Sequence, residues 1–302
     1  MNEIENEIEN VKLALMKSSA PLEPTGGSLG RLFETRMGIA NQALLRRWQE
    51  RYRPTLEWGR IYLPHHFIRP ASRMHEWLGA QLDGFQLARG LKLNVLGPRG
   101  HAKSTIATTC YVLRAAVEGW ERYIWIVSDT IQQAILHLEN VKWELTDNVR
   151  LAEDYPLVVG KGRRWQRHVV ELANGVIIEA WSTGQRVRGR RRREHRPTLI
   201  VCDDLQNDSH ISSAAQREAS RRWFHGTLLK AGTKRTNVLN LATALHRDAL
   251  AMELLTAAGW NSRRFAAIES WPTNLELWQR WEEIYTGHSE EGQQPPACKA
   301  KM

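Results

Sequence analysis

The 302-residue sequence has little cysteine, no long apolar run and no targeting segment at its start. Cys110, Cys202 and Cys298 lie far apart without CxxC spacing, so neither a zinc site nor a disulfide framework is indicated. Cys110 and Cys202 stand in apolar runs, where small core residues are expected. No stretch reaches the ~18 consecutive apolar residues of a membrane span. The acidic start lacks the basic head and apolar middle of a signal peptide. We therefore expect a cytosolic protein without a membrane partner.

The composition is that of an ordinary globular protein with an excess of positive charge. Hydrophobic residues make up 42% and charged residues 25%, values that allow a sizeable core. Lys and Arg total 42 against 33 Asp and Glu, which gives a net charge of +9 and favours a polyanionic partner. The excess is concentrated, because seven arginines fall between Arg186 and Arg196.

Patterning along the chain predicts helices first and then alternating strands and helices. Helices are expected at 1–20 and 31–57, and a further helix after Ser72, which is a plausible N-cap. From about residue 91, buried apolar strands at 91–97, 122–128, 198–204 and 237–243 alternate with helices at 103–118, 130–144 and 212–232. The segment 168–181 reads as a hairpin around Asn174-Gly175. This order predicts an α/β fold with a mainly parallel sheet covered on both faces.

The sharpest motif is a glycine-containing segment between a predicted strand and a predicted helix. Small residues there let backbone N–H groups surround phosphates, and the helix N-terminus adds partial positive charge. Lys103 would reach the β- and γ-phosphates, and the Ser104 hydroxyl would bind Mg²⁺. Ala102 stands where the common GxxxxGK[ST] pattern has glycine, which is tolerable if its φ is negative. The predicted ATP-binding loop is Gly97, Pro98, Arg99, Gly100, His101, Ala102, Lys103, Ser104 and Thr105.

A phosphate-binding loop of this kind needs a second metal-binding carboxylate at the end of a neighbouring strand. The apolar run at 198–204 ends in Asp203 and Asp204. We predict that Asp203 holds Mg²⁺ through water and that Asp204 orients and polarises the attacking water, a role more often held by glutamate. The alternative is an apolar strand that simply ends in an acidic turn.

Five segments, in order, resemble the large terminase subunit of tailed double-stranded DNA phages, over about residues 60–285. Ser128, Thr130 and Gln133 stand in the places expected for the family's second strand and helix. The segments are GPRGHAKST (Walker A), YIWIVSDTIQQAILHLENVKWEL, RVRGRRRREHRPTLIVCDDLQND (arginine-glycine loop and Walker B), NLATALHRDALAMELL (coupling motif) and IESWPTNLELWQRWEEI. Their order is more specific than any single segment.

The resemblance implies a P-loop NTPase fold of the additional-strand, RecA-like type, with a small helical N-terminal subdomain. The expected division is an N-terminal lid segment at 1–60, an ATPase domain at 61–270, and a C-terminal helix with a polar tail at 271–302. The implied catalytic residues are Arg99, which senses or stabilises the γ-phosphate, and Asp204, which orients the water. They also include Thr243, which couples hydrolysis to movement, and Arg188, which precedes Gly189 as in the family's arginine-glycine loop. His75 stands where a glutamine is frequent, which leaves adenine selectivity open.

The resemblance also implies an ATP-driven motor that uses Mg²⁺ to translocate double-stranded DNA into a procapsid in the host cytoplasm. The implied partners are double-stranded DNA, the portal protein, the small terminase subunit and further copies in a ring, with a monomer in solution left open. Large terminases normally continue into a two-metal nuclease. Glu290 and Glu291 lie in a polar tail without the strands that hold such a site, and we expect no nuclease activity.

The arginine run admits three interpretations. It could contact DNA phosphates, supply an arginine finger to a neighbouring subunit's site, or form a solvated loop. Histidines 65, 66, 75 and 101 fit no metal-ligand spacing and are expected to be ordinary loop residues. Most of the 13 tryptophans are expected in the core, with Trp271, Trp278 and Trp281 packing the C-terminal helix onto the motor.

Two other functions are open at this point. One is another P-loop nucleic-acid-dependent ATPase such as a helicase, although the chain is short for a second RecA-like domain. The other is an inactive or truncated prophage remnant that binds nucleotide or DNA without turnover. Ala102, the Asp-Asp pair and the expected lack of a nuclease segment keep this last possibility open.

Overall fold

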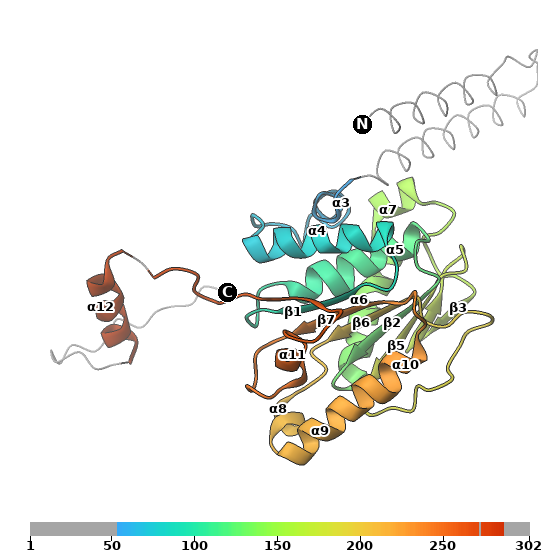
Figure 1. The fold of residues 1–302 in the computed structure, drawn as a ribbon. Helices are drawn as coiled ribbons and strands as arrows, with labels where there is room; N and C mark the ends of the chain where they lie inside the picture. The colour runs from blue at the N-terminus through green and yellow to red at the C-terminus, as the bar shows by residue number, and fades with distance from the viewer. Residues whose placement is uncertain (1–52, 272, 287–302) are drawn as a thin grey trace, which may run out of the picture.

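A computed structural model describes residues 53–271 and 273–286 (Figure 1). The helix expected at 1–20, nearly all of that expected at 31–57, the polar tail from 287 and Cys298 lie outside these residues. The expected domain boundaries therefore remain predictions. Among the described helices none is long and apolar enough to cross a bilayer.

The centre of the molecule is an eight-stranded sheet in the order β3-β4-β5-β2-β6-β7-β1-β8. In this order, every neighbouring pair from β5 through β2, β6, β7 and β1 to β8 is parallel, and β3 and β4 add an antiparallel edge. This confirms the mainly parallel α/β fold, with β7 as the additional strand between β1 and β6. The strands are β1 Lys92–Leu96, β2 Tyr123–Ser128, β3 Arg164–Gln166, β4 Val169–Glu171, β5 Ile177–Ser182, β6 Leu199–Asp203, β7 Asn237–Ala242 and β8 Asn261–Arg264.

Helices cover both faces of the sheet, as Figure 1 shows with α3 to α7 on one side and α8 to α11 on the other. The α-helices are α3 Thr55–Tyr62, α4 Arg73–Leu87, α5 Val112–Val117, α6 Ile131–Asp147, α7 Val149–Asp154, α8 Asp208–Ile211, α9 Ala214–Trp223, α10 Leu229–Ala231, α11 Leu250–Glu253 and α12 Leu275–Thr286. Two π-helical segments, η1 Thr105–Tyr111 and η2 Phe224–Leu228, lie directly before α5 and α10.

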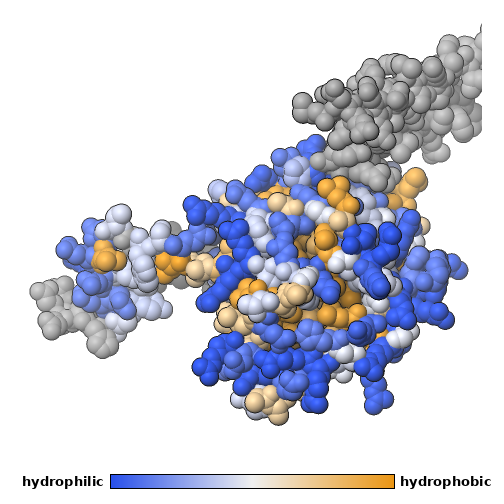
Figure 2. Space-filling model, viewed as in Figure 1, coloured by the Kyte–Doolittle hydropathy of each residue, from blue (hydrophilic) through white to orange (hydrophobic). Residues whose placement is uncertain are grey.

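The two layers bury two separate cores because side chains alternate across each strand. In β2, Ile124 and Ile126 join the core under α3 to α7, whereas Trp125 and Val127 join the core under α9 to α11. All six residues of β2 are buried, as expected for a central parallel strand. Most of the visible outer surface is hydrophilic (Figure 2).

Local signals explain several element boundaries. The Ser72 hydroxyl accepts from the backbone N–H of His75, and the Nδ1 of His75 accepts from the N–H of Ser72, so the predicted cap is a full capping box. The hairpin between β4 and β5 turns at Gly175, which has a φ of 81°. Cys110 and Cys202 are buried, as expected.

Three features differ from the sequence-based expectation. The helix predicted at 103–118 begins as the π-helical segment η1. Strands β3 and β8 were not predicted, since both are short and polar. The prediction that the tryptophans of the C-terminal segment pack onto the motor is wrong: α12 buries none of its residues, and Trp271, Trp278 and Trp281 are 64%, 39% and 52% exposed. These rings instead contact one another, edge to face between Trp271 and Trp278 and tilted between Trp278 and Trp281.

Candidate nucleotide-binding site

The motif residues meet at one edge of the sheet. Strands β1, β2, β6 and β7 are parallel, so their carboxyl ends lie side by side, as ligand sites in such sheets do. A cavity of about 260 Å³ opens there. Its lining residues are Arg99, Ser104, Asp129, Gln133, His137, Asp203, Asp204, Gln206, Asn207, Thr243 and Leu245.

A larger cavity, of about 1010 Å³, lies at the opposite edge of the sheet. It is lined by residues that precede strands, among them Arg89, Thr198 and Arg235. None of the predicted site residues lines it, so its size does not make it the nucleotide site.

The loop after β1, predicted to bind phosphate, contains two residues with a positive φ. A Cβ on Gly97 would lie 2.6 Å from the Sδ of Met74, so a larger residue there would displace the Met74 side chain. Gly100 has a φ of 76°. Ala102 has a φ of 51°, so the condition that its φ be negative is not met, and its methyl group is held in the left-handed region. Such a conformation costs roughly 1–2 kcal/mol for a residue with a Cβ.

His75 and His101 hold the loop in place. The Nε2 of His75 lies 2.9 Å from the carbonyl oxygen of His101, and the Nδ1 of His101 lies 2.9 Å from that of Arg99. His75 thus fixes the loop backbone from the N-terminus of α4. The Arg99 side chain is exposed at the mouth of the cavity.

Lys103 is buried under the loop. Its ammonium group donates to the carbonyl oxygens of Gly97 and Pro98 at 3.0 and 2.8 Å. Burial lowers the pKa of Lys103, while the nearby Asp204 and Asp203 carboxylates partly oppose that shift. A cation desolvated in this way gains strongly from an incoming anion.

Ser104 and Asp203 face one another across the two strand ends. The Ser104 hydroxyl donates to Oδ1 of Asp203 at 3.0 Å, and the Thr108 hydroxyl donates to Oδ2 at 2.5 Å. The Nε2 of His137 lies 3.6 Å from the same Oδ2. Asp203 is only 2% exposed, so these contacts fix a buried carboxylate.

Asp204 occupies the next position with a left-handed backbone, at a φ of 48°. Its Oδ1 accepts from the backbone N–H of Thr243 at 3.2 Å. Burial and the adjacent Asp203 charge raise the pKa of Asp204, against the opposing effect of Lys103. A carboxylate with a raised pKa in a cleft is a common arrangement for proton transfer and water activation.

Thr243 follows β7 and is within reach of Asp204. Among the described residues its hydroxyl is buried without a hydrogen-bond partner. The backbone of the same residue bonds to the carboxylate that the sequence assigns to the water. A movement of the Asp204 carboxylate would therefore act directly on the backbone at the end of β7.

Several residues at or beside the cavity were not assigned to the site from the sequence, although Gln133 stood in its expected place on the predicted helix. Thr108 lies four residues after Ser104, a spacing that could have indicated a shared helix face. Gln133 and His137 lie one turn apart on α6, with their side-chain nitrogens 3.2 Å apart. The Nδ2 of Asn207 donates to Asp129 at 3.0 Å, and no local pattern signals that pair.

Arg188 does not line this cavity. Its guanidinium donates to the carbonyl oxygen of Gly226 at 2.7 and 3.1 Å, on the face covered by α9 and η2. Other members of the run are also engaged within the chain: Arg192 pairs with Glu179 at 2.7 Å and Arg193 with Glu171 at 2.8 Å. The run is therefore partly structural.

Arg186 and Arg191 are exposed, and among the described residues neither side chain makes a hydrogen bond or an ion pair. They are the members of the run best placed to meet an external anion. Which of the three interpretations holds for the run stays a prediction.

The donor set fits a hard cation and a phosphate chain. Ser104 and Asp203 offer a hydroxyl and carboxylate oxygens, the ligand types that Mg²⁺ prefers, and Lys103 and Arg99 offer positive charge. Asp204 lies beside them as a separate carboxylate. Binding of a nucleoside triphosphate with Mg²⁺ is the chemistry that this arrangement can perform.

Comparison with known proteins gives similarities among solved structures alone. No family model matches the chain, and no curated protein matches it. Among solved structures, the large terminase ATPase domain of Thermus phage P74-26 is 17% identical, covering 73% of this chain and 92% of that one, with a TM-score of 0.36. A single-site mutant of that domain is 16% identical over the same shares, with a TM-score of 0.38.

Proposed function

We propose that the chain is an Mg²⁺-dependent ATPase that drives phage DNA packaging. The observation that carries the ATPase part is the hydrogen bond between Ser104 and Asp203, 3.0 Å long, beneath the loop that holds Lys103. It joins the hydroxyl of the phosphate-binding loop to the carboxylate of the acidic strand end. These are the two protein ligands that a P-loop NTPase uses for its metal.

The proposed chemistry is in-line attack of water on the γ-phosphate. Lys103 and Arg99 neutralise charge on the transferring phosphoryl group, and Ser104 and Asp203 hold the metal. Mg²⁺, when bound, would supply positive charge that offsets the charge developing on the phosphate oxygens. Asp204 positions the water and accepts its proton. Thr243 couples hydrolysis to movement through the hydrogen bond from its backbone N–H to Asp204.

The packaging part rests on the ordered sequence segments and on charge. Five segments resemble those of large terminase subunits in the family's order. The net charge of +9 and the exposed Arg186 and Arg191 favour a DNA partner. The portal protein, a small terminase subunit and a ring of copies are proposed as further partners on the resemblance alone.

A second candidate is nucleotide or DNA binding without turnover. The observation in its favour is Ala102, which is held at a φ of 51° where the common motif has glycine. A loop strained in this way is compatible with binding even where catalysis has been lost.

The experiment is phosphate release from ATP by the full chain, with and without linear double-stranded DNA. The packaging motor predicts turnover that rises with DNA and falls with added salt, because DNA contacts are screened. Turnover indifferent to DNA leaves an ATPase but contradicts the DNA motor. ATP binding without turnover under all conditions favours the second candidate.

A further inference from the structure

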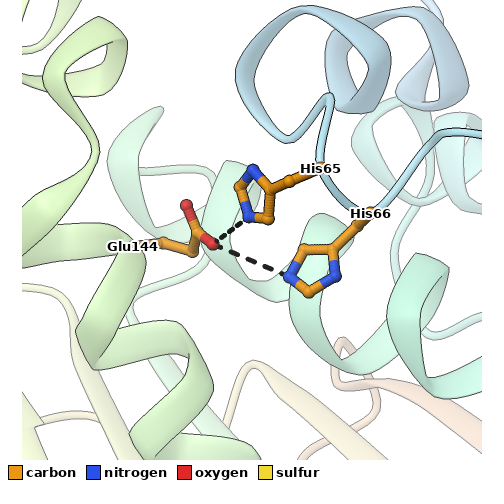
Figure 3. Close-up of side chains that lie close together, drawn as sticks. All are labelled: His65, His66 and Glu144. Atoms are coloured by element: carbon orange, nitrogen blue, oxygen red, sulfur yellow. Dashed lines mark hydrogen bonds and ion pairs between the residues drawn. The ribbon is translucent and has the colours of Figure 1, made fainter. Parts of the chain in front are cut away.

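A second cluster of ligand-type side chains lies away from the nucleotide cavity. His65 and His66 follow α3, and Glu144 is on α6 (Figure 3). One ligand atom from each residue lies within 4.8 Å of the others. None of the three residues lines the nucleotide cavity, and the proposed ATPase chemistry uses none of them.

We propose that His65, His66 and Glu144 bind one divalent transition-metal ion of the zinc class. The set combines two imidazoles and one carboxylate, which suit Zn²⁺, Co²⁺ and Ni²⁺. Three protein ligands leave the remaining coordination position to water. The ion ties the segment after α3 to the C-terminal half of α6.

The distances agree with this assignment. The Nε2 atoms of His65 and His66 lie 2.7 and 3.7 Å from Oε1 of Glu144. Donors around a tetrahedral ion with bonds of 2.0–2.2 Å are about 3.3–3.6 Å apart, and one observed separation lies below this range and the other just above it. Small side-chain rotations therefore suffice to admit the ion. Figure 3 shows all three groups pointing toward one another.

The Glu144 carboxylate presents one of its two oxygens to the histidines. Glu144 is only 4% exposed, and its Oε2 accepts from the Nδ2 of Asn148 at 2.7 Å, which leaves Oε1 facing the histidines. The same Nδ2 donates to the carbonyl oxygen of Tyr62 at 2.7 Å, and the Oδ1 of Asn148 accepts from the N–H of Leu151. Asn148 thus fixes Glu144 and the end of α3 together, as outer-shell residues do at metal sites.

The histidines are accessible and suited to the neutral state. His65 and His66 side chains are 50% and 38% exposed, so an ion can enter from solvent. Burial lowers the pKa of His66, with a further contribution from His65, against the opposing effect of Glu144. A neutral imidazole is the form that binds metal.

The test is isothermal titration of the full chain with Zn²⁺, in a buffer without ATP or chelator. We expect one ion per chain, with affinity at least roughly tenfold weaker in His65→Ala and in His66→Ala. His168→Ala, an exposed histidine outside the cluster, is the matched control and keeps wild-type affinity. Repeating the titrations in a His288→Ala/Cys298→Ser background excludes ligands from the C-terminal tail.

Two further measurements keep the result interpretable. Co²⁺ gives visible absorption bands characteristic of tetrahedral coordination in the wild type, and these bands are lost in His66→Ala. Zn²⁺ raises the melting temperature of the wild type but not of His66→Ala, because only a ligand of the folded state stabilises it. Absence of binding, or equal affinity in both histidine variants and the wild type, overturns the proposal.

Discussion

The backbone N–H of Thr243, at the end of β7, donates to the side-chain Oδ1 of Asp204, at the end of β6, at 3.2 Å. The bond connects the strand between β1 and β6 to the carboxylate that we assign to the attacking water. It also favours the charged form of Asp204, which burial and Asp203 disfavour. Asp204 is therefore a carboxylate whose protonation and position both bear on the proposed reaction.

Asp204→Asn is expected to make the fold more stable at pH 7. Folding raises the pKa of Asp204. The stability that the protonated carboxyl contributes is therefore fully present below the unfolded pKa of about 3.9. That contribution is lost as pH rises through the folded pKa, and at neutral pH the buried charge opposes folding. Urea unfolding at pH 7 should give a higher midpoint for the variant, with the difference shrinking toward pH 4.

Asp203→Asn provides the contrast, because Asp203 accepts hydrogen bonds from Ser104 and Thr108. Its replacement is expected to lower stability at pH 7. An Asp204→Asn variant no more stable than the wild type would show that the environment of Asp204 is not unfavourable to its charge.

Ala102→Gly is expected to stabilise the chain by about 1 kcal/mol, since glycine adopts a positive φ without steric cost. For a domain of this size the corresponding rise in melting temperature is about 2–4 °C. Ala102→Val should act in the opposite direction, because a β-branched residue fits this conformation less well than alanine. Thermal unfolding of the three proteins side by side tests the left-handed conformation at this position. Equal melting temperatures would argue against it.

Thr108→Val keeps the size of the side chain but removes the hydroxyl that donates to Asp203. A buried acceptor that loses its donor costs about 1–3 kcal/mol, and we expect a loss of stability in this range together with weaker Mg²⁺-dependent turnover. Thr109→Val, at the next position of η1, is the matched control, since no bond joins it to Asp203 among those described. Equal losses of stability and turnover in the two variants would show that the Thr108 hydroxyl has no special part in the proposed Mg²⁺ site.

Arg186→Gln combined with Arg191→Gln is expected to weaken DNA binding. Each lost phosphate contact should reduce the slope of log affinity against log salt by about 1, so the double variant should lose about 2. Arg192→Gln should instead lower stability with little change in slope, because Arg192 pairs with Glu179. Fluorescence anisotropy with a DNA duplex at several salt concentrations measures the slopes. An unchanged slope in the double variant would assign the run to structure alone.

Periodicity and turn chemistry were enough to predict the core strands and the layered fold. Buried runs such as 198–204 are continuous and apolar, as central parallel strands require. Strand β8 escaped prediction because its residues, Asn261 to Arg264, are polar, and its pairing with β1 depends on backbone hydrogen bonds. Its position follows from tertiary context rather than from local preference.

The candidate site was predictable where residues are adjacent in sequence and much less so where they are not. The phosphate-binding loop and the Asp203–Asp204 pair are local motifs. The contribution of His137 depends on how α6 crosses the sheet, and that of Glu144 on which residues α3 brings near it. The positive φ of Ala102 is likewise a property of the folded loop, which the residue type does not disclose.

The most direct measurement is steady-state phosphate release from ATP with Mg²⁺, comparing the wild type with Lys103→Ala and Asp204→Asn, and using the exposed Lys161→Ala as the control. Loss of the P-loop lysine removes the charge that neutralises the phosphates, and loss of Asp204 removes the water-positioning carboxylate, a role worth about 10²–10⁴-fold in rate. The proposed function predicts turnover in the wild type and in Lys161→Ala, and its loss in the other two variants. Wild-type turnover in Lys103→Ala would contradict it.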